Sequence, residues 1–214
     1  MTGRRRRESA TGRVLAPAGA PPTGARDGRE LGARDGRGAA TVGASVHPFA
    51  LCWGFVRMAR RLRLVELDFA DTAPLRLSFT ADVGASAETV YAALADEVET
   101  WPSWFSSVAE VTPAQGGKGR DVRLKGGGFF SETIMAALPA ERYTYRIDRT
   151  NVPGVRAMME DWNLAVSPAG GTRVRWTMAV DAPPLLRAAM RLGRPGIGAS
   201  FRQAMRALER RLAA

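Results

Sequence analysis

Two glutamates interrupt otherwise apolar strand faces, and they are the residues whose placement most suggests chemistry. Glu132 alternates with Phe130 and Ile134, and Glu160 lies in a second apolar face of the same kind. A carboxylate in such surroundings is costly to bury, so each glutamate is expected to have a partner or a raised pKa. One of the two would then act as a general base on an acidic C–H of a ligand.

Two tyrosines extend this group of polar residues. Tyr143 and Tyr145 fall on the apolar face of residues 142–148, and either hydroxyl could donate a hydrogen bond to a carbonyl that becomes an enolate. With Glu132 or Glu160 as the base, this arrangement would suit a cofactor-free cyclase or dehydratase. The alternative interpretation places both glutamates near strand ends, ion-paired to arginine or hydrated, with no chemical role.

The elements that carry these residues follow from alternation and turn signals. Residues 75–83 alternate apolar and polar side chains, which predicts a half-buried strand. Ser86 then caps a helix that runs to about residue 96, and a second short helix is predicted at 100–108. Six further strands separated by turn residues are predicted at 108–113, 120–125, 129–138, 142–148, 155–166 and 172–182. Two C-terminal helices are predicted at 185–192 and 200–212, with Gly193-Arg194-Pro195-Gly196 between them.

This order predicts an α+β fold, in which a curved antiparallel sheet of about seven strands wraps around the long C-terminal helix. Such a sheet commonly leaves a cavity against the helix, lined by the inward-facing side chains. The candidate ligand contacts are Trp101, Trp104, Phe105, Phe130, Ile134, Tyr143, Tyr145, Met158, Trp162, Trp176, Met178, Phe201 and Met205. For Trp101 and Trp104 the alternative is a purely structural place in the core.

A resemblance to a known family rests on the stretches "VGASAETVYAALADEVETWPSWFSSVAEV", "FFSETIMAALPAERYTYRI" and "EDWNLAVSPAGGTRVRWTMAV". They are similar to the START-like helix-grip superfamily, and most similar to its polyketide cyclase/dehydrase and lipid-transport (SRPBCC) family. The resemblance covers about residues 75–212. It implies the helix-grip fold and a cavity for a hydrophobic or amphipathic small molecule of lipid, polyketide or isoprenoid type. It implies no single reaction, so ligand binding without turnover and the cyclase or dehydratase activity both stay open.

The composition excludes several kinds of site. The 214 residues include one cysteine (Cys52) and one histidine (His47), which rules out an intrachain disulfide, a CxxC redox pair and a Cys/His zinc site. No cofactor and no metal are therefore expected. No apolar run reaches the roughly 18 residues of a membrane span. The apolar residues 42–56 lack the flanks of a secretory signal, which favours a cytoplasmic protein.

The net charge of +10 is concentrated near the N-terminus. Residues 1–63 carry 13 arginines and four acids, whereas residues 64–214 carry 18 basic and 17 acidic side chains. We therefore expect a disordered basic tail, rich in Arg, Gly, Ala and Pro, over 1–62, and the ligand-binding domain over 63–214. The alternative is that the natural protein starts near Met58 and lacks the preceding residues. The near-neutral domain argues against a nucleic-acid partner, and weak contact with a membrane surface stays open. We expect a monomer or a homodimer.

Overall fold

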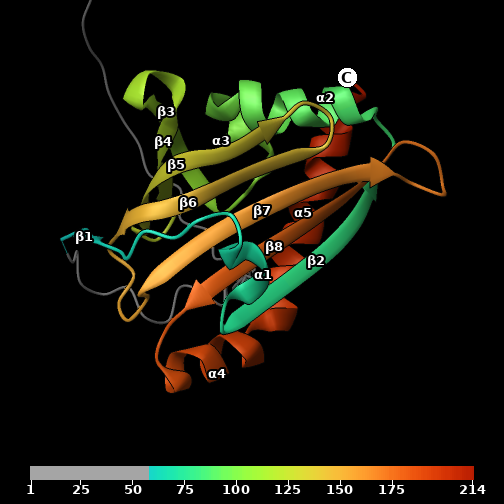
Figure 1. Cartoon of the computed structure of the whole chain (residues 1–214). Helices are drawn as coiled ribbons and strands as arrows, with labels where there is room; N and C mark the ends of the chain where they lie inside the picture. Colours follow the sequence, from blue (N-terminus) through green and yellow to red (C-terminus); the bar gives the residue numbers. More distant parts are fainter. Residues whose placement is uncertain (1–57) are drawn as a thin grey trace, which may run out of the picture. The chain divides into compact units, whose positions relative to one another are not determined.

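The computed structural model describes residues 58–214 (Figure 1). Residues 1–57, which make up most of the predicted tail and precede the alternative start at Met58, lie outside the described residues. Three residues that the charge pattern places in the tail contact the folded domain. Arg60–Arg61 form strand β1, which pairs with a strand of the main sheet, and Leu62 is buried. The folded part therefore begins slightly before position 63.

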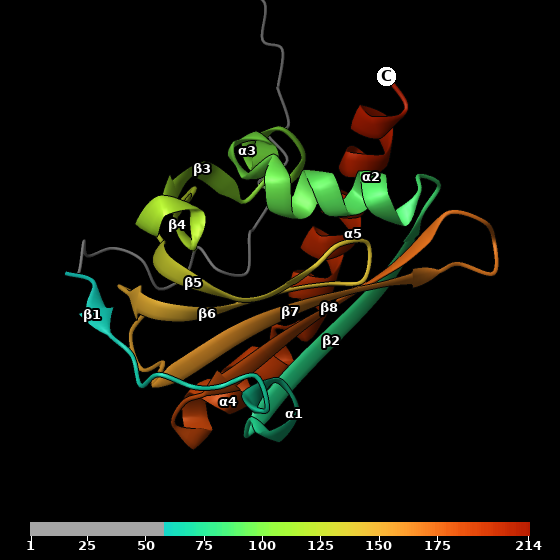
Figure 2. The same cartoon turned by 45° about the horizontal axis from the view of Figure 1, so that its top comes forward.

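One antiparallel sheet forms the framework of this domain, with its main strands in the order β2-β8-β7-β6-β5-β4-β3. The strands are β2 (Leu75–Val83), β3 (Val108–Ala114), β4 (Gly119–Leu124), β5 (Phe129–Leu138), β6 (Arg142–Thr150), β7 (Ala157–Val166) and β8 (Thr172–Asp181). A long helix, α5 (Arg194–Leu212), packs against one face of the sheet, called here the inner face (Figure 2). This arrangement confirms the predicted α+β fold with its antiparallel sheet on a C-terminal helix.

Strand β6 has two different partners along one of its edges. β7 pairs only with the first half of β6, from Arg142 to Arg146. β1 pairs with Arg149 and Thr150 near the other end. The segment that precedes β2 therefore extends the sheet at the point where β7 no longer pairs with β6.

Short helical pieces connect β2 to β3. They are α2 (Ala87–Tyr91), a π-helical turn (Ala92–Asp96), a 3₁₀ turn (Val98–Thr100) and α3 (Trp101–Trp104). The Ser86 hydroxyl oxygen accepts a hydrogen bond from the Thr89 N–H, as expected of the predicted N-cap. The second helix is shorter than predicted because Phe105 already has an extended backbone and ends α3 at Trp104.

The two C-terminal helices, α4 (Pro184–Leu192) and α5, are separated by Gly193 alone. The predicted four-residue break is therefore too long. Pro195 lies in the first turn of α5, where a missing N–H removes no intrahelical hydrogen bond. A proline that looks like an interruption in the sequence thus belongs to a helix start.

Apolar side chains cover both faces of the central strands. On the inner face, α5 contributes Phe201, Met205 and Leu208 to the main core. On the outer face, the segment before β2 and its short helix α1 (Phe69–Thr72) form a second cluster that includes Met159 of β7. Among residues 58–214, no helix is long and apolar enough to cross a membrane.

Candidate functional site

A buried ion pair lies on the inner face of neighbouring strands. Arg120 of β4 and Glu132 of β5 are directly opposite partners in the strand pairing. The Arg120 Nε atom donates a hydrogen bond to Glu132 Oε2 at 2.7 Å. The two residues are only 1% and 4% exposed. This pair is the most deeply buried ion pair among the described residues, and burial makes its remaining hydrogen-bonding groups costly to leave unpartnered.

The Arg120 guanidinium lies between aromatic rings, and only part of its hydrogen-bonding capacity is used. Its central carbon lies 4.0 Å from the centroid of a Trp101 ring and 4.3 Å from that of Tyr145, which are cation–π contacts. Neither its Nη1 nor its Nη2 atom has a hydrogen-bond partner among residues 58–214. The Trp104 Nε1 and the Tyr143 hydroxyl are also buried without a partner in this part of the chain. The interior therefore contains several N–H and O–H groups with unused hydrogen-bonding capacity.

The second glutamate, Glu160, accepts two hydrogen bonds on one carboxyl oxygen. The Tyr145 hydroxyl donates to Glu160 Oε2 at 2.7 Å, and Trp176 Nε1 donates to the same oxygen at 2.9 Å. The Tyr145 oxygen accepts a hydrogen bond from Trp162 Nε1 at 3.0 Å. These hydrogen bonds hold the Glu160 carboxyl in one position. Glu160 is therefore better placed to orient Tyr145 and Trp176 than to contact a ligand directly.

Burial sets the protonation of these groups. It raises the pKa of Glu132 to about 7, although the nearby Arg120 opposes the shift. Burial also raises the pKa of Glu160, against the hydrogen bonds from Tyr145 and Trp176. Burial tends to lower the pKa of Arg120, but Glu132 and the two tyrosines outweigh it, so the net direction is upward and the guanidinium stays charged. Glu132 can therefore gain or lose a proton near neutral pH.

The other candidate contacts surround the same interior. Phe130 and Ile134 are half-buried. The buried members are Trp101, Trp104, Phe105, Tyr143, Tyr145, Met158, Trp162, Trp176, Met178, Phe201 and Met205. Their rings pack on one another, with centroids 5.4 Å apart for Trp162 and Trp176 and 5.7 Å apart for Trp176 and Phe201. The expected open cavity is occupied by these side chains in this structure.

Arg120 was not singled out by the sequence pattern, although a signal for it exists. It alternates with Val122 and Leu124, so an arginine shares a strand face with apolar residues. The same rule that identifies Glu132 therefore also identifies its partner. Residues 58–214 contain no group of three or more His, Cys, Asp or Glu side chains placed to hold a metal ion.

The fold has relatives of known structure. The aromatase/cyclase ZhuI from Streptomyces sp. R1128 superposes with a TM-score of 0.54 at 18% identity, covering 64% of this chain and 95% of that one. A START superfamily protein from Mycobacterium smegmatis superposes with a TM-score of 0.51 at 16% identity, covering 64% and 97%. At these identities the likeness concerns the fold alone.

Sequence comparison gives the family. An uncharacterised protein of Mycobacterium tuberculosis, Rv2574, is 31% identical over 151 residues, which cover 68% of this chain and 89% of that protein. The family model for polyketide cyclase/dehydrase and lipid transport proteins matches residues 74–213. The chain therefore belongs to the polyketide cyclase/dehydrase and lipid transport family.

Proposed function

We propose that the domain binds a hydrophobic or amphipathic small molecule of lipid, polyketide or isoprenoid type between the sheet and α5. The observation that carries this proposal is the buried Arg120 guanidinium with two unpartnered nitrogens. A carbonyl, carboxylate or phenolate oxygen on the ligand would accept hydrogen bonds from these nitrogens. The apolar remainder of the ligand would lie among the aromatic rings that surround Arg120.

Binding requires the rings to move, because they fill the interior in this structure. Trp101 and Trp104 belong to the segment of short helical pieces between β2 and β3. Such pieces contain few consecutive backbone hydrogen bonds, so displacing them disrupts less structure than displacing α5. We therefore place the entrance on the side of α3, where a shift of Trp101 would uncover Arg120.

Native mass spectrometry of the full chain, purified gently from its own host, tests this proposal. We expect an added mass that leaves on denaturation and that is lost in Arg120→Met. The matched control is Arg123→Met, which removes an exposed arginine three positions along β4. A ligand retained equally by both variants would contradict the role of Arg120.

A second candidate function is favoured by the protonation of Glu132. A carboxyl group with a pKa of about 7 is suited to accept a proton at neutral pH. Glu132 would take the proton of an acidic ligand C–H while Arg120 stabilises the resulting enolate oxygen. The protonated acid would then return this proton to a departing hydroxyl, which leaves as water. Such a cofactor-free cyclase or dehydratase needs no group beyond these side chains.

Turnover of the ligand identified by mass spectrometry distinguishes the two functions. We expect Glu132→Gln to abolish turnover and to preserve binding, since the amide keeps the shape but cannot accept the proton. Glu160→Gln tests the other carboxyl group in the same way. Activity retained in both variants would leave the binding function and remove the catalytic one.

A further inference from the structure

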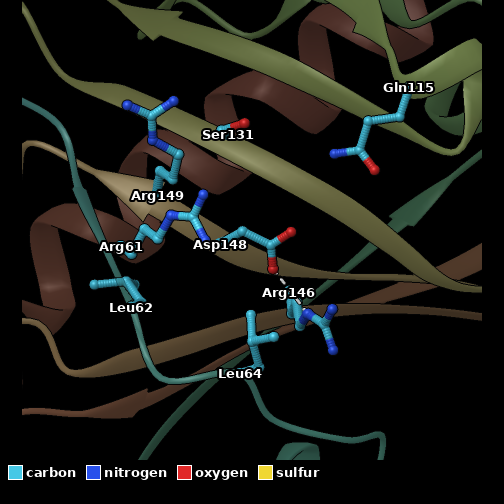
Figure 3. A pocket seen from close by; sticks show the side chains of 8 residues that line it. All are labelled: Arg61, Leu62, Leu64, Gln115, Ser131, Arg146, Asp148 and Arg149. Atoms are coloured by element: carbon cyan, nitrogen blue, oxygen red, sulfur yellow. Dashed lines mark hydrogen bonds and ion pairs between the residues drawn. The ribbon is translucent and has the colours of Figure 1, made fainter.

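A groove of about 390 Å³ lies on the outer face of the sheet, separate from the interior described above (Figure 3). It forms where β1 and the residues after it run beside β6, and it extends to Ser131 of β5 on the other side of β6. The residues that line it are Arg61, Leu62, Leu64, Gln115, Ser131, Arg146, Asp148 and Arg149. Its volume lies within the range of small-molecule sites. The proposed function makes no use of it.

A β-bulge directs Arg149 into this groove. Ile147 faces the interior, so regular alternation would send residue 149 to the interior as well. However, Glu132 of β5 pairs with Ile147, whereas the preceding Ser131 pairs with Arg149, which leaves Asp148 as an extra residue. The bulge reverses the alternation and places Arg149 beside Ser131 on the outer face. Bulges commonly redirect side chains in this way next to functional sites.

Two arginines meet in the groove, and no acid among residues 58–214 pairs with either of them. Arg61 and Arg149 are directly opposite partners in the pairing of β1 with β6, where like charges destabilise a sheet. Within residues 58–214, no carboxylate lies at salt-bridge distance from either guanidinium. The lining acid, Asp148, already pairs with Arg146 at 2.8 Å, and Glu66 lies 3.7 Å from Arg146 on its other side. Within the part of the chain that the structure describes, the charges of Arg61 and Arg149 are therefore not neutralised by an ion pair.

Two neutral residues add hydrogen-bond donors to the same groove. Ser131 contributes a hydroxyl, and Gln115 contributes an amide from the turn between β3 and β4. Gln115 has a φ of 53°, in the left-handed region that is unfavourable for a residue with a side chain. Strain of this kind is often found at ligand sites. Leu64, whose side chain is exposed, supplies an apolar surface beside the groove, whereas the Leu62 side chain is buried in the main core.

We propose that this groove binds the phosphate group of a phosphorylated small molecule, with Arg61 and Arg149 as its charged partners. Guanidinium groups bind phosphate oxygens through paired, charge-assisted hydrogen bonds. Two uncompensated positive charges match the dianion of a phosphate monoester. The groove is larger than a phosphate group, so the organic part of the ligand would lie against Leu64.

Calorimetric titration of the full chain with phenyl phosphate at low ionic strength tests the site. Arg61→Gln and Arg149→Gln are each expected to weaken binding by about tenfold or more, because each removes a charged bidentate donor. Arg175→Gln is the matched control, since Arg175 is an exposed arginine of β8 on the outer face. All variants keep the basic N-terminal residues, so binding there affects them equally. Equal affinity in Arg149→Gln and Arg175→Gln, or no binding by the unaltered chain at millimolar ligand, overturns the proposal.

Thermal unfolding without ligand separates a binding role from a structural one. Removing one of two opposed like charges is expected to leave Tm unchanged or to raise it by about 1 to 3 °C. Lower affinity without lower Tm supports the site, whereas a clear fall in Tm with unchanged affinity overturns it.

Vesicles containing phosphatidic acid identify the source of the phosphate. Co-flotation with these vesicles that depends on Arg149 would assign the phosphate to a lipid headgroup. Binding of phenyl phosphate without such flotation would assign it to a soluble ester.

Discussion

The raised pKa of Glu132 makes a quantitative prediction about stability and pH. The pKa is raised from 4.5 to about 7 in the folded protein. The folded state therefore holds a proton that the unfolded state has already lost between these two values. The contribution of Glu132 to the free energy of unfolding is fully present below pH 4.5 and is lost as the pH rises through about 7. At 1.36 kcal/mol per pKa unit, the loss is about 3 kcal/mol.

Glu132→Gln removes this dependence because the amide does not titrate. We expect the free energy of unfolding of the variant, relative to the unaltered chain, to rise by about 2.5 kcal/mol between pH 5 and pH 8. Urea unfolding at both pH values measures this change, which corresponds to a relative midpoint shift of about 1.2 M. Glu160 has a pKa shift in the same direction, so some pH dependence remains in the variant.

Glu110→Gln is the control, since it removes an exposed carboxylate of β3 that pairs with Arg123 at 3.4 Å. The test uses only the pH dependence of the difference in unfolding free energy between Glu132→Gln and the unaltered chain. A constant offset from altered packing in Glu132→Gln therefore does not affect it. Parallel stability profiles for Glu132→Gln and the unaltered chain would refute the assigned protonation of Glu132.

Three further substitutions test the surroundings of the site. Tyr145→Phe removes the hydroxyl shared by Glu160 and the Trp162 indole, and is expected to destabilise the fold by about 1 to 3 kcal/mol in urea unfolding; an unchanged midpoint would contradict the network. Gly119→Ala places a Cβ atom 2.3 Å from a carbonyl oxygen of β5, and should lower Tm by more than any surface substitution. Ser86→Ala removes the oxygen that caps α2, and is expected to cost about 1 kcal/mol, measured by the same unfolding assay.

Much of the fold was accessible to sequence reasoning because alternation is a local signal. Predicted strands 75–83 and 129–138 match β2 and β5 residue for residue. Glu132 and its inward direction follow from the same alternation. The limits of the helices around 100–108 and 193–196 were less accessible. The first depends on the extended backbone of Phe105, and the second on a proline that starts a helix.

The ion pair and the outer groove depend on contacts between distant residues. Arg120 meets Glu132 only through the register of two strands, which no single strand pattern specifies. Arg149 points outward only because the pairing of β5 with β6 contains a bulge. Strict alternation along the strand would place this side chain on the opposite face of the sheet. The filled interior likewise depends on how the side chains pack together. An aromatic residue in the sequence is equally compatible with a packed core and with the wall of an open cavity.

The four tryptophans of the described domain also give the protein an intrinsic optical reporter. Rings of Trp101 and Trp104 lie 5.0 Å apart, those of Trp101 and Trp162 5.8 Å, and those of Trp162 and Trp176 5.4 Å. Indoles this close couple their electronic transitions, so the near-ultraviolet circular dichroism reflects their mutual orientation. A molecule bound between the sheet and α5 among these rings would change their mutual orientation. Its arrival could therefore be followed in the unlabelled chain as a change in this spectrum.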